Sequence, residues 1–294
     1  VWLIVDINTI GLNPFMESTF NGNLEILYSN EYQIKNCFEK YFKQCSGFKN
    51  LKIGAVKSLS ISIPPYAFFG MNQIEGKITL SSSICSIGKY AFSDCYFYKI
   101  EFDNKISINE GAFYNCANIN TTIDLSNFNI EKANYEIPSR LFSGCSKLPS
   151  IIFPSFVERI GNEAFSGCFS LSFHLDFFAN IHHIGKSAFY RCLSLKGSLE
   201  ISQNTKYIAE SAFYGCTGLS GSLTIHVGSF KKPTFIGPFA FKYCTGFKNG
   251  KLFFFINKND EKEIHSINDQ SFLIIGNEAF EGTKFKNVYY NGRY

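Results

Sequence analysis

The sequence contains the stretch Ile160-Gly161-Asn162-Glu163-Ala164-Phe165-Ser166-Gly167-Cys168, and the pattern Ile-Gly-x-x-Ala-Phe-x-x-Cys recurs along the chain. Aligned on its phenylalanine, the motif occurs ten times, centred on Phe42, Phe68, Phe92, Phe113, Phe142, Phe165, Phe189, Phe213, Phe241 and Phe280. Successive copies lie 21 to 29 residues apart, except for a last interval of 39 residues. A repeat of this length predicts a solenoid in which each copy forms one coil.

The spacing inside each copy predicts its local structure. In Ile184 to Cys192 the apolar residues fall on one arc of a helical turn, so we expect a short, inward-facing helix there. An alternating run follows the cysteine, and alternation with a period of two is typical of a strand. We therefore expect one strand per coil, stacked into a parallel sheet. The runs are Ile78-Thr79-Leu80, Ile100-Glu101-Phe102, Ile123-Asp124-Leu125, Phe173-His174-Leu175, Leu199-Glu200-Ile201, Leu223-Thr224-Ile225 and Val288-Tyr289-Tyr290.

Composition and charge narrow the class of protein. Hydrophobic residues make up 45% of the 294 residues and are spread evenly, which favours one elongated domain. The net charge of +4 is small and dispersed, so we expect no nucleic-acid partner. No apolar run approaches the roughly 20 residues of a membrane helix, so we expect no direct membrane insertion. The chain begins with Val1 and not Met, and it ends on a strand pattern, so we expect the protein to continue beyond these residues.

The motif, with the apolar anchor and strand that follow it, resembles the BspA-like leucine-rich repeat family. The resemblance extends from about residue 37 to the end and is strongest between Phe142 and Phe241. Departures from the pattern occur at Cys37, Tyr41, Met71, Leu141 and Thr283. The resemblance implies a β-rich α/β repeat fold, a leucine-rich repeat solenoid with a parallel sheet on its concave face and short helical or 3-10 segments elsewhere.

The resemblance also implies a function. Proteins of this family are usually non-enzymatic, lie at the microbial cell surface or are secreted, and bind a host or partner protein or glycoprotein. A cytoplasmic interaction scaffold stays open as the alternative. The oligomeric state does not follow from the sequence.

The ends and one long interval depart from the repeat. Residues 1–36 do not fit the motif, and we expect them to form an N-terminal cap or a degenerate first coil. Residues 37–294 then form the solenoid of about ten coils. An insertion near residues 256–270 contains the charged run Asn257 to Glu263, which predicts a protruding loop. This loop either carries binding or is a tolerated, mobile segment.

Cysteine is the most reactive member of the motif. Eight of the ten cysteines share one repeat position, which favours a ladder of small, buried side chains: Cys45, Cys95, Cys116, Cys145, Cys168, Cys192, Cys216 and Cys244. Disulfides between neighbouring coils are the alternative in an oxidising compartment, because stacked strands lie about 4.8 Å apart. The wide spacing does not match a zinc site, so we expect neither a metal nor another cofactor.

The positions that the motif leaves free are the candidates for binding. The middle residue of each predicted strand faces the concave surface, and consecutive aromatics at Phe253 to Phe255 and at Tyr289 to Tyr290 cannot all point inward. The candidate partner-binding residues are Glu101, Asp124, His174, Asp176, Glu200, Thr224, His226, Phe254 and Tyr289. Asp176, Ser202 and His226 have the residue types of a hydrolase triad, which leaves a hydrolase as a remote alternative. Strand spacing alone does not orient them for nucleophile activation, so we expect no catalytic residue.

Overall fold

Two strands and one turn segment make up most coils of the computed structural model. The structure describes residues 2–6, 19–28, 46–55, 60–72, 74–102, 105–126, 128–129, 134–173, 175–227, 233–256 and 273–290. The first motif copy around Phe42, His174 and the insertion from residue 257 lie outside the described residues. The chain groups into two compact units. The N-terminal unit comprises Val1–Asn134 and Arg140–Pro154, and the C-terminal unit comprises Tyr135–Ser139 and Ser155–Tyr294.

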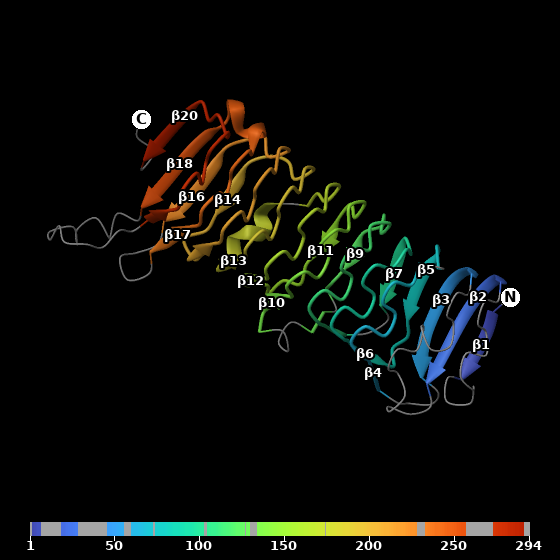
Figure 1. Cartoon of the computed structure of the whole chain (residues 1–294). Coiled ribbons are helices and arrows are strands. Elements are labelled where there is room, and N and C mark those ends of the chain that lie inside the picture. The colour runs from blue at the N-terminus through green and yellow to red at the C-terminus, as the bar shows by residue number, and fades with distance from the viewer. Residues whose placement is uncertain are drawn as a thin grey trace. The chain divides into compact units, whose positions relative to one another are not determined.

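The N-terminal unit contains three parallel sheets (Figure 1). The five-stranded sheet has the order β1 (Trp2–Asp6), β2 (Thr19–Tyr28), β3 (Ser46–Ala55), β5 (Lys77–Leu80) and β7 (Lys99–Phe102). A pair is formed by β9 (Ile123–Asp124) and β11 (Ile151–Ile152). The three-stranded sheet contains β4 (Ile61–Ile63), β6 (Ile84–Ile87) and β8 (Ser107–Ile108). The strands β1 and β2 thus continue the first sheet into the part of the chain that lacks the motif.

The C-terminal unit contains two parallel sheets and two short 3-10 helices. One sheet has the order β10 (Glu136–Ile137), β12 (Arg159–Ile160), β13 (His183–Ile184), β15 (Tyr207–Ile208), β17 (Thr234–Ile236) and β19 (Leu273–Ile275). The other has the order β14 (Leu199–Ile201), β16 (Leu223–Val227), β18 (Lys251–Ile256) and β20 (Asn287–Tyr290), which lie side by side in Figure 1. The 3-10 helices are η1 (Leu175–Asn180) and η2 (Thr245–Asn249). None of the helices in the described part of the chain has the length and apolar character needed to cross a membrane.

The β-rich repeat solenoid is confirmed, and six of the seven predicted strand runs are strands. The run Phe173 to Leu175 is the exception, because Leu175 opens η1. The reason lies in the next aromatic residues. Phe178 is fully buried, and its ring packs edge-on at 5.4 Å from Phe189 and 5.5 Å from Phe213. A helical turn brings this phenylalanine into the core, where a strand would have placed Leu175.

The prediction of one strand per coil is wrong, because a second strand precedes each copy of the motif that the structure describes. This strand ends on the isoleucine of the motif, as in Arg159–Ile160 and His183–Ile184, and its residues alternate outward and inward. Most of these strands are only two or three residues long. A run so short shows no recognisable alternation in the sequence, so only its pairing with the neighbouring coils identifies it.

The predicted inward helix over residues 184–192 is also wrong, because this segment is a chain of turns. Ser187 and Arg191 have positive φ angles of 52° and 56°, which a right-handed helix excludes. Every second backbone N–H group donates within the coil, to the carbonyl oxygens of Gly185, Ser187 and Phe189. The intervening N–H groups of Ser187, Phe189 and Arg191 bond instead to carbonyls of the next coil, at 2.9, 2.8 and 2.7 Å. The turn segments therefore form a third hydrogen-bonded ladder between coils.

The cysteines stabilise this turn ladder. The thiol of Cys216 donates to the carbonyl oxygen of Phe189 in the preceding coil, with Sγ 3.0 Å from the oxygen. Five further cysteines make the same bond, at 2.9 to 3.1 Å: Cys95, Cys116, Cys145, Cys192 and Cys244. Burial raises the pKa of Cys95, Cys192 and Cys216, which keeps these thiols protonated and able to donate. The eight cysteines in the described part of the chain are free thiols.

The motif phenylalanines form stacks beneath the turn ladder. In the C-terminal unit, the rings of Phe165, Phe189, Phe213, Phe241 and Phe280 stack in sequence at 5.2 to 5.4 Å. In the N-terminal unit, Phe68, Phe92, Phe113 and Phe142 stack at 5.0 to 5.8 Å. Each coil thus buries its phenylalanine largely against the phenylalanines of its neighbours, so its core depends on stacking.

The motif glycine is explained by close approach of two coils. A Cβ atom on Gly237 would lie 2.6 Å from the backbone nitrogen of Glu210 in the preceding coil. Gly88, Gly161, Gly185 and Gly276 would meet neighbouring backbone at 2.4 to 2.7 Å. These glycines thus permit tight coil stacking at the step from the second strand into the turn segment.

We expect Cys216→Ala to lower the free energy of unfolding by about 1–2 kcal/mol, because a buried hydrogen bond and the packing of the sulfur atom are both lost. Urea denaturation of the intact chain measures this loss. Cys85→Ala is the control, because Cys85 is half-buried and lies outside the motif ladder. Equal losses for the two variants would contradict a special role for the ladder thiols.

We expect Gly237→Ala to cost about 2 kcal/mol or more, since the added Cβ displaces the backbone of the preceding coil. Gly215→Asn is the matched control, because Gly215 has a φ of +69° and only a side-chain atom of Arg191 near its Cβ position. Asn115 occupies the same motif position at φ 55°, so this change should cost little. The melting temperatures of the two variants provide the comparison, and a more stable Gly237→Ala would refute the packing argument.

Candidate functional site

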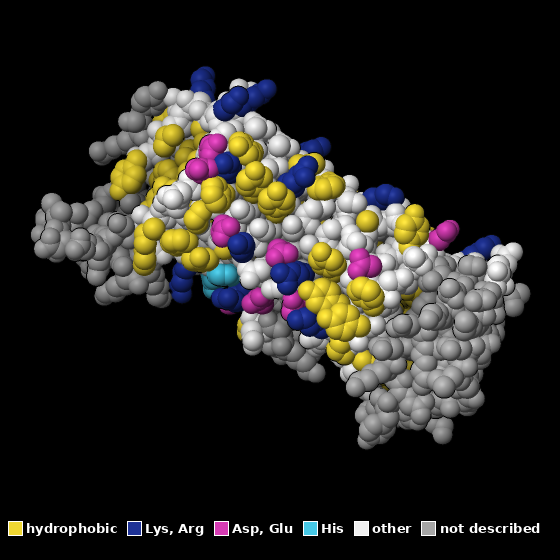
Figure 2. Space-filling view, viewed as in Figure 1, with side chains coloured by type: hydrophobic (Ala, Val, Ile, Leu, Met, Phe, Trp, Pro, Cys, Tyr) yellow, Lys and Arg dark blue, Asp and Glu magenta, His cyan; other side chains and the backbone are white. Residues whose placement is uncertain are grey.

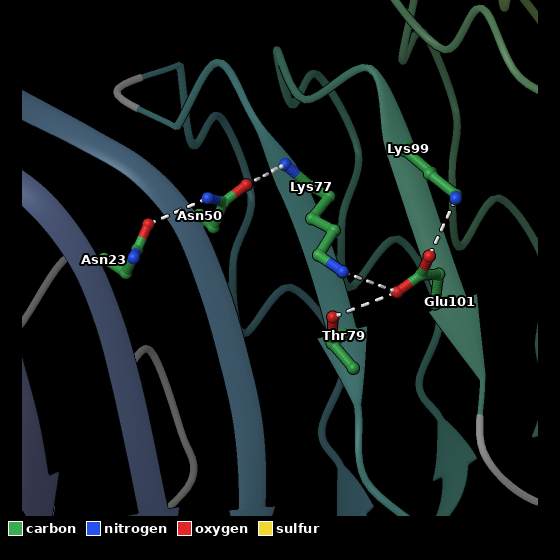
Figure 3. Close-up of polar contacts among 6 residues, drawn as sticks. All are labelled: Asn23, Asn50, Lys77, Thr79, Lys99 and Glu101. Carbon is green, nitrogen blue, oxygen red and sulfur yellow. Dashed lines mark hydrogen bonds and ion pairs between the residues drawn. The ribbon is translucent and has the colours of Figure 1, made fainter. Parts of the chain in front are cut away.

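The outward side chains of β2, β3, β5 and β7 form a polar face (Figure 3). The amide of Asn50 donates to Asn23 at 2.8 Å and accepts the backbone N–H of Lys77 at 2.9 Å. The Nζ atoms of Lys77 and Lys99 lie 3.0 and 2.7 Å from the carboxylate of Glu101. The hydroxyl of Thr79 donates to the same carboxylate at 3.4 Å. The predicted neighbours Thr79 and Glu101 are therefore adjacent.

The charges of the polar face neutralise one another. Hydrogen bonds from Lys99 and then Lys77 lower the pKa of Glu101 and keep it ionised. On the neighbouring strands, Lys52 pairs with Glu25 at 2.7 Å. A partner that replaced these contacts would gain little, because each charge already has a partner of opposite sign.

Asp124 does not join the polar face. Its strand β9 pairs with β11, so Asp124 lies beside Ile152 and not beside Glu101. The carboxylate of Asp124 accepts the backbone N–H of Ser126 at 2.8 Å, which is a local turn interaction. The predicted continuous column is thus divided, and Asp124 has a structural role in its own loop.

The outward side chains of β14, β16, β18 and β20 form an aromatic face. Parallel pairing places Glu200, Thr224, Phe253 and Tyr289 in one column across the four strands. His226 and Phe255 pair in a second column. The rings of Phe253 and Tyr289 stack at 4.9 Å, and those of His226 and Phe255 stack at 5.4 Å. Four predicted binding residues, Glu200, Thr224, His226 and Tyr289, therefore share this surface.

The prediction for Phe254 is wrong. Phe254 is 8% exposed and lies in register with Ile225, a core residue of the neighbouring strand. Phe253 and Phe255 take the outward positions instead and stack with each other at 5.9 Å. The aromatic run does face both ways, as expected, but the pairing register decides which rings reach the surface.

The hydrolase alternative is not supported by the geometry. Asp176 lies on η1 and not on a strand beside Ser202. The hydroxyl of Ser202 accepts the backbone N–H of Asn204 at 3.1 Å. The Nε2 atom of His226 lies 2.7 Å from the carboxylate of Glu200. Ser202 and His226 are thus engaged in separate local interactions and do not form the serine–histidine contact that nucleophile activation requires. The described residues also contain no group of three or more histidine, cysteine or acidic side chains suited to a metal ion.

A further surface column was missed because it lies on the second strands. It consists of the residues directly before each motif isoleucine: Glu136, Arg159, His183, Tyr207, Phe235 and Ile274. The ring of Tyr207 stacks between His183 and Phe235, at 5.2 and 4.7 Å. Burial lowers the pKa of His183, and the charge of Arg159 lowers it further. Comparison of the residue directly before the motif isoleucine in successive copies would have shown this column.

We expect Glu101→Gln to lower stability by less than about 1 kcal/mol at neutral pH, because the ion pairs of Glu101 are partly exposed. The pKa of Glu101 is depressed in the folded chain, so its contribution is present at neutral pH and is lost as the pH falls below about 4. Melting temperatures measured across this range should therefore converge for the variant and the parent chain at acid pH. A difference that grows on acidification would contradict the assigned ion pairs.

Comparison with known proteins connects this geometry to a family. The model of the BspA type leucine rich repeat region matches residues 35–123 and 120–248, with six copies, which is well over half of the chain. A comparison with curated proteins found no match.

Solved structures of bacterial leucine-rich repeat proteins also show similarity. A leucine rich repeat protein of T. pallidum is 20% identical over 76% of this chain and 86% of its own, with a TM-score of 0.41. A leucine-rich repeat protein from Bacteroides ovatus is 19% identical over 91% and 78%, with a TM-score of 0.43. A leucine rich cell surface protein from Faecalibacterium prausnitzii is 15% identical over 90% and 82%, with a TM-score of 0.32. These scores are too low to carry an argument. On the strength of the motif match, the chain belongs to the BspA-type leucine-rich repeat family.

Proposed function

We propose that this chain is a cell-surface adhesion or partner-recognition scaffold that binds a partner protein through the aromatic face. Repeat proteins of this family are typically interaction scaffolds and not enzymes, which supports the general class. The observation that carries the specific proposal is the group of stacked, half-buried rings of Phe253, Phe255 and Tyr289 on a sheet surface. Aromatic side chains are enriched at protein interfaces because they bury a large area at little entropic cost.

The orientation of the rings favours a protein over a glycan. The planes of Phe253 and Tyr289 differ by 19°, and those of His226 and Phe255 by 20°. Near-parallel rings at this spacing cover one another's faces and leave their edges for a partner. A sugar that binds by stacking needs an open ring face, whereas ring edges pack against side chains and carbonyl oxygens. In a glycoprotein partner, the aromatic face would therefore contact the polypeptide.

The polar face has a smaller part in this proposal. Its lysines and carboxylates already pair within the sheet, and a partner must break those contacts before it forms new ones. The aromatic face carries fewer internal ion pairs, and burial of its rings gains hydrophobic free energy directly. We therefore assign the main contact to the C-terminal unit.

An interaction scaffold inside the cell is the second candidate. The free thiols of the cysteine ladder favour it, because reducing compartments maintain cysteines in this state. Labelling of intact source cells with a membrane-impermeant biotin reagent separates the two candidates. Labelled protein supports the surface location, and labelling only after lysis supports the intracellular one.

We expect the triple variant Phe253→Ser, Phe255→Ser and Tyr289→Ser to bind candidate host cells at least about tenfold more weakly than the parent chain, because buried aromatic side chains dominate interface energies. Flow cytometry with the fluorescently labelled, purified chain measures this binding.

The matched control is Phe69→Ser with Tyr96→Ser and Phe156→Ser, three exposed aromatics that do not belong to the strands of the aromatic face. Circular dichroism verifies that both variants remain folded. Absence of parent-chain binding, or equal binding by all three proteins, would refute the assignment.

A further inference from the structure

Five exposed lysines border one end of the aromatic face. Each lies in the segment that leads into a strand of this face or is the first residue of that strand. They are Lys196 before β14, Lys248 and Lys251 at β18, and Lys284 and Lys286 before β20. The backbone N–H of Lys286 bonds to the carbonyl of Gly250 at 2.9 Å, which places Lys286 beside the start of β18. Figure 2 shows dark blue side chains projecting at the upper end of this unit, where these strands begin. We call this group the lysine border.

The lysine border differs from three other cations of the C-terminal unit, which pair with carboxylates. Arg159 pairs with Glu136 at 3.2 Å, Lys186 pairs with Glu210 at 3.0 Å, and Lys242 pairs with Glu278 and Glu281. Among the described residues, none of the five border lysines has a carboxylate within ion-pair distance. Arg191 and Lys206 also lie outside ion-pair distance of a carboxylate among the described residues, so the border is distinguished by the grouping of five such lysines along the aromatic face.

The ring edges have the same electrostatic preference as the lysine border. An aromatic ring carries negative potential on its face and positive potential on its edge. Because the rings of Phe253, Phe255 and Tyr289 stack on one another, their edges are presented outward. Lys251 lies over the ring of Tyr289, with Nζ 5.3 Å from its centroid, so its charge occupies part of the ring face. Carboxylates and carbonyl oxygens suit both the edges and the ammonium groups.

We infer that the aromatic face with its lysine border takes an acidic segment of a partner protein, whose apolar side chains pack on the ring edges while its carboxylates pair with the lysines. This inference rests on the proposed function and adds the chemistry of the partner. A nucleic acid or a sulfated glycan would use mainly the lysines, because Phe253 and Tyr289 each cover one face of the other ring and Lys251 lies over the ring of Tyr289. The lysines are also few and confined to one border, unlike the phosphate-binding surface of a nucleic-acid protein.

Fluorescence anisotropy of the purified, intact chain tests the inference with three short labelled peptides and with heparin. One peptide alternates glutamate and leucine, the second alternates glutamine and leucine, and the third alternates glutamate and serine. We expect the glutamate–leucine peptide to bind at least about tenfold more tightly than the other two, because it alone supplies both charge and apolar contact. Its binding should weaken in about 0.5 M salt, which screens exposed charges.

Two triple variants locate the site. Lys248→Gln with Lys251→Gln and Lys286→Gln should weaken binding of the glutamate–leucine peptide about tenfold, since three exposed ion pairs are lost. Lys186→Gln with Arg191→Gln and Lys206→Gln removes the same charge from other surfaces of the unit and should change binding less than about twofold. Equal losses in the two variants would show a general charge effect and overturn the inference.

The remaining outcomes are equally decisive. Heparin that binds as tightly as the glutamate–leucine peptide and depends on the same lysines would assign the border to polyanions and overturn the inference. Peptide binding that is unchanged when the lysines are substituted overturns the inference as well. If cell binding still requires Phe253 and Phe255 in that case, the proposed function is retained. If the parent chain does not bind cells but binds the glutamate–leucine peptide in a lysine-dependent way, the result would contradict the proposed cell-surface role and support the assigned partner chemistry.

Discussion

The hydrogen bonds between successive turn segments are the constraint on which the rest of the structure depends. Within each turn, alternate N–H groups bond inside the coil, and the others reach carbonyls of the next coil. The positive φ angles at two positions per motif, such as Ser187 and Arg191, make this alternation possible. The cysteine thiol adds a further bond to the carbonyl of the motif phenylalanine, as Cys216 does to Phe189. A single coil leaves these groups unsatisfied, so the fold exists only as a stack.

Stacking in register converts each repeat position into a column, and the chemistry of a column follows from its members. Where the members carry opposite charges, they neutralise one another, as Glu101 does with Lys77 and Lys99. Where they are aromatic, their rings stack at the spacing of the coils, as Phe253 does with Tyr289. The same regularity that buries the motif phenylalanines therefore organises the surface. In such a protein, the columns suited to specific binding are the few whose side chains are not fully paired or packed against one another.

The aromatic face is the clearest column of that kind. Its rings present their edges, its neighbouring sheet end carries exposed lysines, and a hydrogen bond joins His226 to Glu200. The polar face of the N-terminal unit, by contrast, is internally paired. A scaffold with one self-neutralised face and one face that combines apolar surface with uncompensated charge is suited to a partner that supplies both an apolar strip and carboxylates.

Much of the fold could be predicted from the sequence, because the motif repeats the same core residues at a fixed interval. Most of the parallel strands after the cysteines, the ladder of buried cysteines and the family itself all followed from that interval. The helix expected over residues 184–192 did not form, because its apolar spacing fits an inward helix and a chain of turns equally well. The second strands were too short to show an alternating pattern.

The candidate site was predicted only in part, because surface columns depend on which strands pair and in which register. The predicted residues Glu200, Thr224, His226 and Tyr289 share one sheet surface, whereas Phe254 is buried and its neighbours Phe253 and Phe255 take the outward positions. Asp124 and Asp176 left the expected column because β9 pairs elsewhere and η1 replaces a strand. The sequence by itself determined what the coils bury. Only the tertiary structure decided what they expose, because adjacency between coils is set by hydrogen bonds that join residues distant along the chain.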